Sequence, residues 1–176
     1  MVIGHEITHG FDDQGRQKDK DGNLRDWWPS STVQRFKNRT QCIIEQYEGF
    51  TVPEVNMTVN GVNTQGENIA DNGGLKQAYR AYAQWQQRTS PTQEEPRLPG
   101  LVHHSHQQLF FLAYAHIWCG LSRPDAYAND ILSGVHSPDK FRVIGPLRNL
   151  PEFSEAFKCP VGSPMNPPSH QKCKVW

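Results

Sequence analysis

A histidine pair at the start of the chain limits the folds open to it, because His5-Glu6-Ile7-Thr8-His9 matches H-E-x-x-H. On a helix, positions i and i+4 share one face, so both imidazoles can reach a single Zn²⁺ while Glu6 points at the activated water. Zinc lowers the pKa of such a water to about 7, and a nearby carboxylate can take its proton as the water attacks a carbonyl. We therefore expect a helix over residues 1–11. A solvated helical turn is the alternative for the pentapeptide alone.

A second pair of residues offers the ligand that the histidines lack. A catalytic zinc needs three protein ligands and one open position. Glu67 and Asp71 are spaced i, i+4, so both carboxylates share one helical face. We expect Glu67 to complete a site with His5 and His9, and Asp71 to accept the free ring N–H of a ligating histidine. Residues 64–67 also fit the capping box T-x-x-E, which explains Glu67 but not the aspartate one turn later.

Gly73 and Gly74 follow these carboxylates directly. Each glycine inside a helix costs about 1 kcal/mol relative to alanine. Two adjacent glycines there therefore indicate that another backbone approaches the helix closely. A second helix that carries the two histidines would make this approach.

The rest of the chain reads as helices joined by short connections. We expect a helix after the cap residues 29–32, with Val33, Phe36 and Tyr47 among its apolar positions, and a hairpin over 51–64 with a type I′ turn at Asn60-Gly61. Further predictions are helices over 65–87, 105–121, 124–133 and 152–157, a surface connection over 88–100, an irregular segment over 135–146, and a proline-rich tail from Cys159 that needs a covalent staple.

Composition excludes several classes of protein. With 18 Lys+Arg against 18 Asp+Glu among 176 residues, the chain is long enough for one domain and has no net charge that would favour nucleic acid or an anionic membrane. The longest apolar stretch, 109–121, is shorter than the roughly 18 residues of a membrane-spanning helix. We expect neither a membrane span nor a signal peptide in this chain.

Cysteines and glycosylation acceptors indicate the compartment. Cys42, Cys119, Cys159 and Cys173 are too far apart for a C-x-x-C motif, which leaves disulfides or free buried thiols. Sequons begin at Asn38 and Asn56, and together with the even number of cysteines they favour an oxidising, extracytoplasmic compartment.

Several motifs together resemble the neprilysin and endothelin-converting-enzyme family of zinc endopeptidases, in order from the first residue to the last. They are Val2-Ile3-Gly4-His5-Glu6-Ile7-Thr8-His9-Gly10-Phe11-Asp12-Asp13, Gly66-Glu67-Asn68-Ile69-Ala70-Asp71-Asn72-Gly73-Gly74, Gln108-Leu109-Phe110-Phe111, Val135-His136-Ser137-Pro138 with Phe141-Arg142-Val143, and Cys173-Lys174-Val175-Trp176.

The resemblance implies a fold and an activity. The fold would be mainly α, a thermolysin-like (gluzincin) helical catalytic lobe with a small β-hairpin, in which residues 1–176 are the C-terminal part of a catalytic domain truncated at its N-terminus. The activity would be zinc-dependent hydrolysis of peptides on the amino side of hydrophobic residues, with one Zn²⁺ per chain. Glu6 would act as general base and then pass the proton to the leaving amine.

The resemblance also assigns roles outside the zinc ligands. His136 matches a donor to the oxyanion of the tetrahedral intermediate, and Arg142 matches an arginine that binds the substrate backbone on the primed side. Many relatives have an aspartate two residues before this histidine, where this chain has Gly134, so Asp12 and Asp13 are the candidate substitutes. The residues that match the apolar S1′ pocket are Met1, Val2, Ile117 and Trp118.

Cysteine pairing and location follow from the same resemblance. It pairs Cys42 with Cys173 and leaves Cys119 and Cys159 to bond with an N-terminal lobe absent from this chain. The resemblance implies a type II membrane protein, as extracellular members of the family are. We therefore expect the extracellular face of the plasma membrane or the secretory pathway, or secretion, with any membrane anchor outside this chain. The alternative function is a non-catalytic module that keeps zinc and binds a peptide or a partner protein.

Overall fold

The computed structural model of the chain describes residues 1–89 and 95–176, and it is mainly helical with a two-stranded antiparallel hairpin, as predicted. Among the described residues, none of the helices combines the length and hydropathy that crossing a bilayer requires. The elements are α1 (Val2–His9), the 3-10 turn η1 (Gly15–Gln17), α2 (Ser30–Glu48), β1 (Thr51–Val52), β2 (Met57–Thr58), α3 (Gly61–Thr89), α4 (His106–Ile117), α5 (Pro124–Ser133), α6 (Asp139–Asn149), α7 (Pro151–Ala156) and η2 (Ser169–Gln171).

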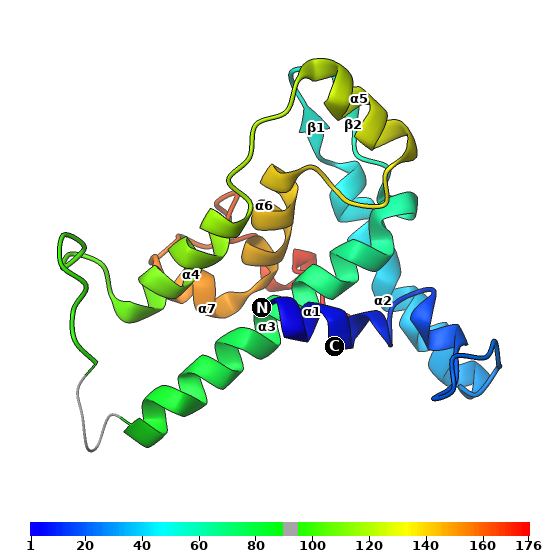
Figure 1. Cartoon of the computed structure of the whole chain (residues 1–176), viewed down its shortest axis with the longest axis horizontal. Helices are drawn as coiled ribbons and strands as arrows, with labels where there is room; N and C mark the ends of the chain where they lie inside the picture. The colour runs from blue at the N-terminus through cyan, green and yellow to red at the C-terminus, as the bar shows by residue number, and fades with distance from the viewer. Residues whose placement is uncertain (90–94) are drawn as a thin grey trace.

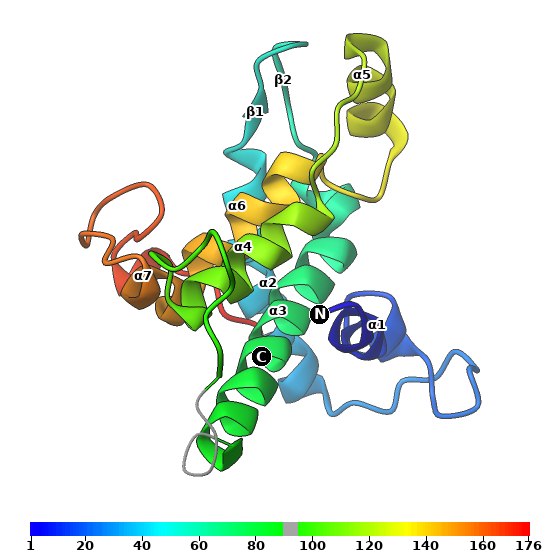
Figure 2. The same ribbon diagram turned by 60° about the vertical axis from the view of Figure 1, so that its left-hand side comes forward.

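The long helix α3 organises the molecule. Its 29 residues run diagonally through the structure, with α1 along one side and α2 and α6 packed against its N-terminal half (Figures 1 and 2). The hairpin and α5 lie together at one end of the molecule, and α7 lies beside α4. Two groups of buried side chains form the core: one joins α2, the hairpin, α5 and α6, and the other joins α3, α4, α6 and α7.

The close approach predicted from Gly73 and Gly74 is present between α1 and α3. A Cβ on Gly74 would lie 2.6 Å from the backbone nitrogen of His5, and a Cβ on Gly73 would lie 2.6 Å from Thr8 Oγ1. Real Cβ atoms do not come so near to a backbone, so any side chain at Gly74 would push the two helices apart. The glycines therefore set the distance between the histidines of α1 and the carboxylates of α3.

The hairpin is present, but the predicted turn is wrong. Residues 53–56 connect β1 to β2, and Asn56 has a positive φ of 49° there. Asn60 instead directly precedes α3, where its side chain accepts a hydrogen bond from the Asn63 amide at 3.0 Å. Gly61 is required by packing, because a Cβ would lie 2.3 Å from the Ile44 carbonyl oxygen on α2. The Asn60-Gly61 pair thus marks the start of α3 and allows α3 to pack closely against α2.

The predicted irregular segment over 135–146 is wrong from Asp139 onward, where α6 begins. Pro146 lies inside this helix, although proline has no N–H and leaves the carbonyl four residues earlier without its partner. That carbonyl belongs to Arg142, and the Tyr114 hydroxyl of α4 donates a hydrogen bond to it. Tertiary structure therefore supplies the donor that the helix lacks.

Other boundaries differ by smaller amounts. Helix α3 starts before residue 65 and continues to Thr89. Helix α4 starts after a capping box between Ser105 and Gln108 and ends at Ile117, earlier than predicted. The connection predicted over 88–100 falls partly on residues 90–94, which lie outside the described residues. Helix α2 begins among the predicted cap residues, but Pro29 occupies its N-cap and provides no side-chain hydrogen bond.

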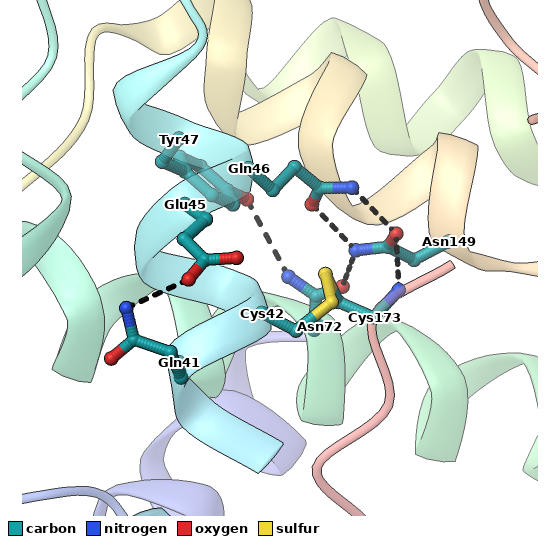
Figure 3. Close-up of a disulfide and its surroundings, with 8 residues drawn as sticks. All are labelled: Gln41, Cys42, Glu45, Gln46, Tyr47, Asn72, Asn149 and Cys173. Carbon is teal, nitrogen blue, oxygen red and sulfur yellow. Dashed lines mark hydrogen bonds between the residues drawn. A yellow bond between two sulfur atoms is a disulfide. The ribbon is translucent and has the colours of Figure 1, made fainter. Parts of the chain in front are cut away.

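The proline-rich tail is held by the disulfide that the resemblance implied. Cys173 is bonded to Cys42 of α2, and Cys119 and Cys159 are free thiols. Figure 3 shows the amides beside this bond: Asn149 of α6 exchanges hydrogen bonds of 2.8 Å with Gln46 and donates to Asn72 of α3 at 2.9 Å. The Cys173 amide donates to Asn149 Oδ1 at 3.0 Å. The tail is thus attached to α2 and α6 at one point, and Asn149 links that point to α3.

Candidate metal centre

Three side chains from α1 and α3 converge on one point. The Nε2 atoms of His5 and His9 are 3.0 Å apart, and those nitrogens lie 3.2 Å and 3.5 Å from the two carboxylate oxygens of Glu67. A tetrahedron with bonds of about 2.1 Å has edges of about 3.4 Å. The three predicted ligands are therefore spaced as zinc ligands are, and among the described residues no other group of His, Cys, Asp or Glu side chains meets the same spacing.

The capping-box alternative for Glu67 does not hold. Thr64 lies within α3, and its hydroxyl donates to the Asn60 carbonyl oxygen at 2.8 Å. Glu67 is therefore beyond the first turn of the helix, and its carboxylate faces the histidines of α1.

A carboxylate stands behind each histidine. Asp71 Oδ1 lies 2.9 Å from His5 Nδ1, although off the direction of the ring N–H, and Asp12 Oδ2 lies 2.6 Å from His9 Nδ1. Such neighbours favour the proton on Nδ1 and leave the Nε2 lone pair free. Asp12 is itself held by the Gln14 and Gly15 amides at 2.9 Å and 2.6 Å.

The electrostatics of this cluster call for a cation. Glu67 Oε2 is buried and accepts no well-formed hydrogen bond, and the Nε2 atoms of His5 and His9 face Oε2 and Oε1 respectively. Burial of His5 lowers its pKa, but Asp71 and Glu67 outweigh this effect and raise the pKa of that imidazole to about 9. Burial raises the pKa of Glu67, and the contact with His5 together with the nearby histidines lowers it to a net value below the usual range. A divalent ion fits this donor set, and His₂Glu with an open position is a zinc pattern.

Arg142 is anchored beside the cluster. Its Nε and Nη2 atoms donate to both oxygens of the fully buried Asp71 at 2.8 Å, and its guanidinium lies 3.9 Å from the centre of the Trp118 ring. Burial lowers the pKa of Arg142, but Asp71 and Glu67 raise it overall, so the side chain stays charged. Asp71 is therefore shared between a candidate zinc ligand and the arginine.

His136 reaches the same cluster from the loop between α5 and α6. Its Nε2 lies 3.2 Å from Glu67 Oε2, and its side chain is 56% exposed. Neither candidate substitute for an orienting aspartate contacts it: Asp12 binds His9, and Asp13 binds Gln14. The expectation that one of these carboxylates would hold His136 is wrong, because the loop after α1 turns them towards α1 and η1 instead.

The remaining predicted site residues are Glu6 and the four residues predicted for the S1′ pocket. Glu6 is exposed, and among the described residues nothing hydrogen-bonds or pairs with its carboxylate. Met1 and Trp118 are partly buried in one apolar cluster, whereas Val2 and Ile117 are 56% and 54% exposed. The structure thus brings together two of the four residues predicted for an S1′ pocket.

Comparisons with known proteins agree with this geometry. The model of peptidase family M13 matches residues 1–173. The chain belongs to this family. It is 54% identical to neprilysin-11 of Caenorhabditis elegans over 99% of the chain, and 53% identical to human endothelin-converting enzyme 1 over all of it. Its fold matches the zinc metalloprotease ZMP1 of Mycobacterium tuberculosis in complex with an inhibitor, with a TM-score of 0.88 and 36% identity over 99% of the chain.

The M13 relatives are much longer than this chain. It spans 20% of neprilysin-11, 22% of endothelin-converting enzyme 1 and 26% of the ZMP1 chain. The matched part is the portion of the M13 fold that carries the H-E-x-x-H helix and α3.

Sequence reasoning missed the role of Asp12 in this centre. The spacing contained the signal, since a residue three positions after His9 follows the end of α1 and can fold back onto the ring. The Asp71–Arg142 pair had no such signal, because 71 residues separate its members.

Proposed function

We propose that this chain is the zinc-binding part of a metalloendopeptidase that hydrolyses peptides on the amino side of hydrophobic residues. The convergence of His5, His9 and Glu67 supports this proposal most directly. A bound zinc would supply a Lewis acid that activates water at neutral pH.

The side chains around the centre take separate roles in this proposal. Glu6, exposed and uncommitted, accepts a proton from the attacking water and passes it to the leaving amine. His136 donates a hydrogen bond to the oxyanion. Arg142 holds the substrate backbone, and Asp71 keeps both His5 and Arg142 in place. The partly buried Met1 and Trp118 provide apolar surface for the hydrophobic side chain that follows the cleaved bond.

The place of action is the secretory pathway or the extracellular side of the cell. The Cys42–Cys173 disulfide and the exposed sequon asparagines Asn38 and Asn56 support this location. Peptides are the expected partners.

The test separates zinc binding from catalysis. In the native protein, Glu6→Gln should retain one zinc per chain and lose at least about 100-fold in kcat for a hydrophobic peptide. Glu67→Ala should lose both zinc and cleavage. Glu155→Gln on α7 is the matched control, because Glu155 is exposed and lies outside the centre. Metal content by mass spectrometry and peptide cleavage by chromatography provide the two readouts.

The same experiment distinguishes the proposed peptidase from the alternative, a non-catalytic zinc module. Such a module would bind zinc in the unmodified protein without cleaving any peptide, and Glu6→Gln would change nothing. Full cleavage by Glu6→Gln would remove the general base from the mechanism.

A further inference from the structure

A buried hydrogen bond joins the loop of His136 to the helix of Glu67. The Ser137 hydroxyl donates to Asn68 Oδ1 at 2.8 Å. Ser137 is 3% exposed and Asn68 is fully buried. Each residue directly follows one of the candidate site residues, so this single contact sets the relative position of two parts of the centre.

The surrounding hydrogen bonds fix the direction of this contact. The Thr64 hydroxyl uses its proton on the Asn60 carbonyl, so it can only accept from Asn68 Nδ2, which lies 2.9 Å away. The Asn68 amide is therefore oriented with its oxygen towards Ser137. Because each polar group in this buried series of hydrogen bonds has a partner, the arrangement is rigid.

The loop has little else to hold it. Residues 135–137 take part in no backbone hydrogen bond among the described residues, and the His136 ring is mostly in solvent. Glu67 is the acidic side chain within ion-pair distance of His136, and zinc binding would occupy that carboxylate. The position of the ring thus depends on its backbone, and the backbone depends on Ser137.

We propose that Ser137 and Asn68 are positioning residues, whose hydrogen bond holds the His136 ring over the metal centre. The inference rests on the proposed peptidase function for its kinetic consequence. Loss of the bond leaves the three candidate zinc ligands in place, since they come from α1 and α3, but frees the loop and the ring. Misplacement of a catalytic group by about 1 Å can cost 100-fold in rate.

Kinetics of matched variants in the native protein test the proposal. Ser137→Ala should lower kcat about 10- to 100-fold and change KM and zinc content by less than about twofold. Ser137→Thr, which keeps the hydroxyl, should restore most of the rate. The control is Ser154→Ala. Ser154 is also buried, but it lies on α7 and its hydroxyl accepts a hydrogen bond from Lys172. If Ser137→Ala does not fold, Ser137→Cys keeps the volume with a weak donor and should show the same loss to a smaller degree.

The decisive comparison is the effect of Ser137→Ala on the rate with and without the His136 imidazole. In a His136→Ala background, Ser137→Ala should cost nothing further, because a positioning residue acts only through the group it positions. An equal loss of rate in both backgrounds, or a parallel loss of zinc, would overturn the proposal.

A second readout does not need activity. With ¹³C at histidine Cε1, the His136 ring signal should be single and sharp in the unmodified protein and in Ser137→Thr, and broadened or shifted in Ser137→Ala. Absence of peptide cleavage in the unmodified protein would refute the proposed function, and the ring signal would then decide this inference alone. An unchanged signal in Ser137→Ala would refute the positioning role.

Discussion

At the scale of single residues, Asp71 links the parts of the centre. It is completely buried, and its two oxygens contact the His5 ring and both donors of Arg142. A buried carboxylate is stable only when its charge is paired and its lone pairs are satisfied, so removal of either partner would leave an uncompensated charge. In the proposed function, Asp71 would therefore couple zinc binding to the placement of the arginine.

Zinc binding should release a proton from His5. Burial lowers the metal-free pKa of His5, but Asp71 and Glu67 outweigh burial and raise that pKa to about 9. At pH 7 the ring is therefore protonated in the folded, metal-free protein, and zinc binds only the neutral imidazole. The apparent affinity should rise about tenfold per pH unit between about pH 7 and 9 and level off above that.

Calorimetry in buffers of different ionisation enthalpy measures this release. We expect about one proton per zinc at pH 7. His170→Gln removes an exposed histidine of η2 and should leave the count unchanged. A heat of binding that does not depend on the buffer would mean that His5 is neutral before zinc arrives.

The sequence predicts much of this centre because helical spacing is local information. Residues at i and i+4 share a face whatever surrounds them, so the meeting of His5, His9 and Glu67 follows once α1 and α3 pack together, and the glycines at 73 and 74 indicate that packing. Contacts such as Ser137 with Asn68 depend on how distant segments are arranged. No local pattern encodes them.

At the scale of elements, the sequence-based predictions are wrong where tertiary contacts outweigh local preference. Asn60-Gly61 favours a tight turn by propensity, but Gly61 is needed where α3 passes the Ile44 carbonyl of α2. Pro146 argues against a helix by itself, yet α6 contains it because Tyr114 of α4 supplies the missing donor. Burial raises the pKa of Tyr114 well above its ordinary value, and the nearby Asp71 charge adds to this effect, so the hydroxyl keeps its proton.

The role of Tyr114 leads to a double-mutant prediction. Tyr114→Phe leaves the Arg142 carbonyl buried without a donor and should lower the free energy of unfolding by about 1–3 kcal/mol. In a Pro146→Ala background the same substitution should cost about 1 kcal/mol less, because the alanine introduced there has a backbone N–H that can donate to that carbonyl. Urea unfolding of the four proteins measures the coupling. Equal costs in both backgrounds would mean that the hydroxyl acts through other contacts.

At the scale of the whole molecule, long-range attachments hold together a chain with little sheet. The C-terminal tail is bonded to α2 and α6 at the disulfide, and the side-chain amide of Asn149 links this point to Asn72 of α3 (Figure 3). The metal centre lies on a different side of α3, where α1 packs. Stability and zinc binding are therefore partly separable in this fold.

The disulfide provides the last prediction. It closes a loop with a sequence separation of 131, for which the chain-entropy model gives a stabilisation of about 5 kcal/mol. Replacement of Cys42 and Cys173 by alanine should lower the free energy of unfolding by several kcal/mol. Under conditions in which the variant remains folded, its zinc affinity should change less than about tenfold. The reason is that the disulfide joins the tail to α2 and touches none of the three candidate ligands.

Peptide mapping and unfolding together check this expectation. For the 176-residue chain by itself, digestion without reduction should give one Cys42–Cys173 pair, and alkylation should label Cys119 and Cys159. Cys119→Ser is the matched control, since this thiol is exposed and unpaired, and its free energy of unfolding should stay within about 0.5 kcal/mol of the parent. A Cys119–Cys159 bridge would contradict the pairing. A loss of zinc as large as the loss of stability would show that the tail supports the metal centre, for which the contact between the Trp176 and Phe11 rings, 6.2 Å between centroids, is a route.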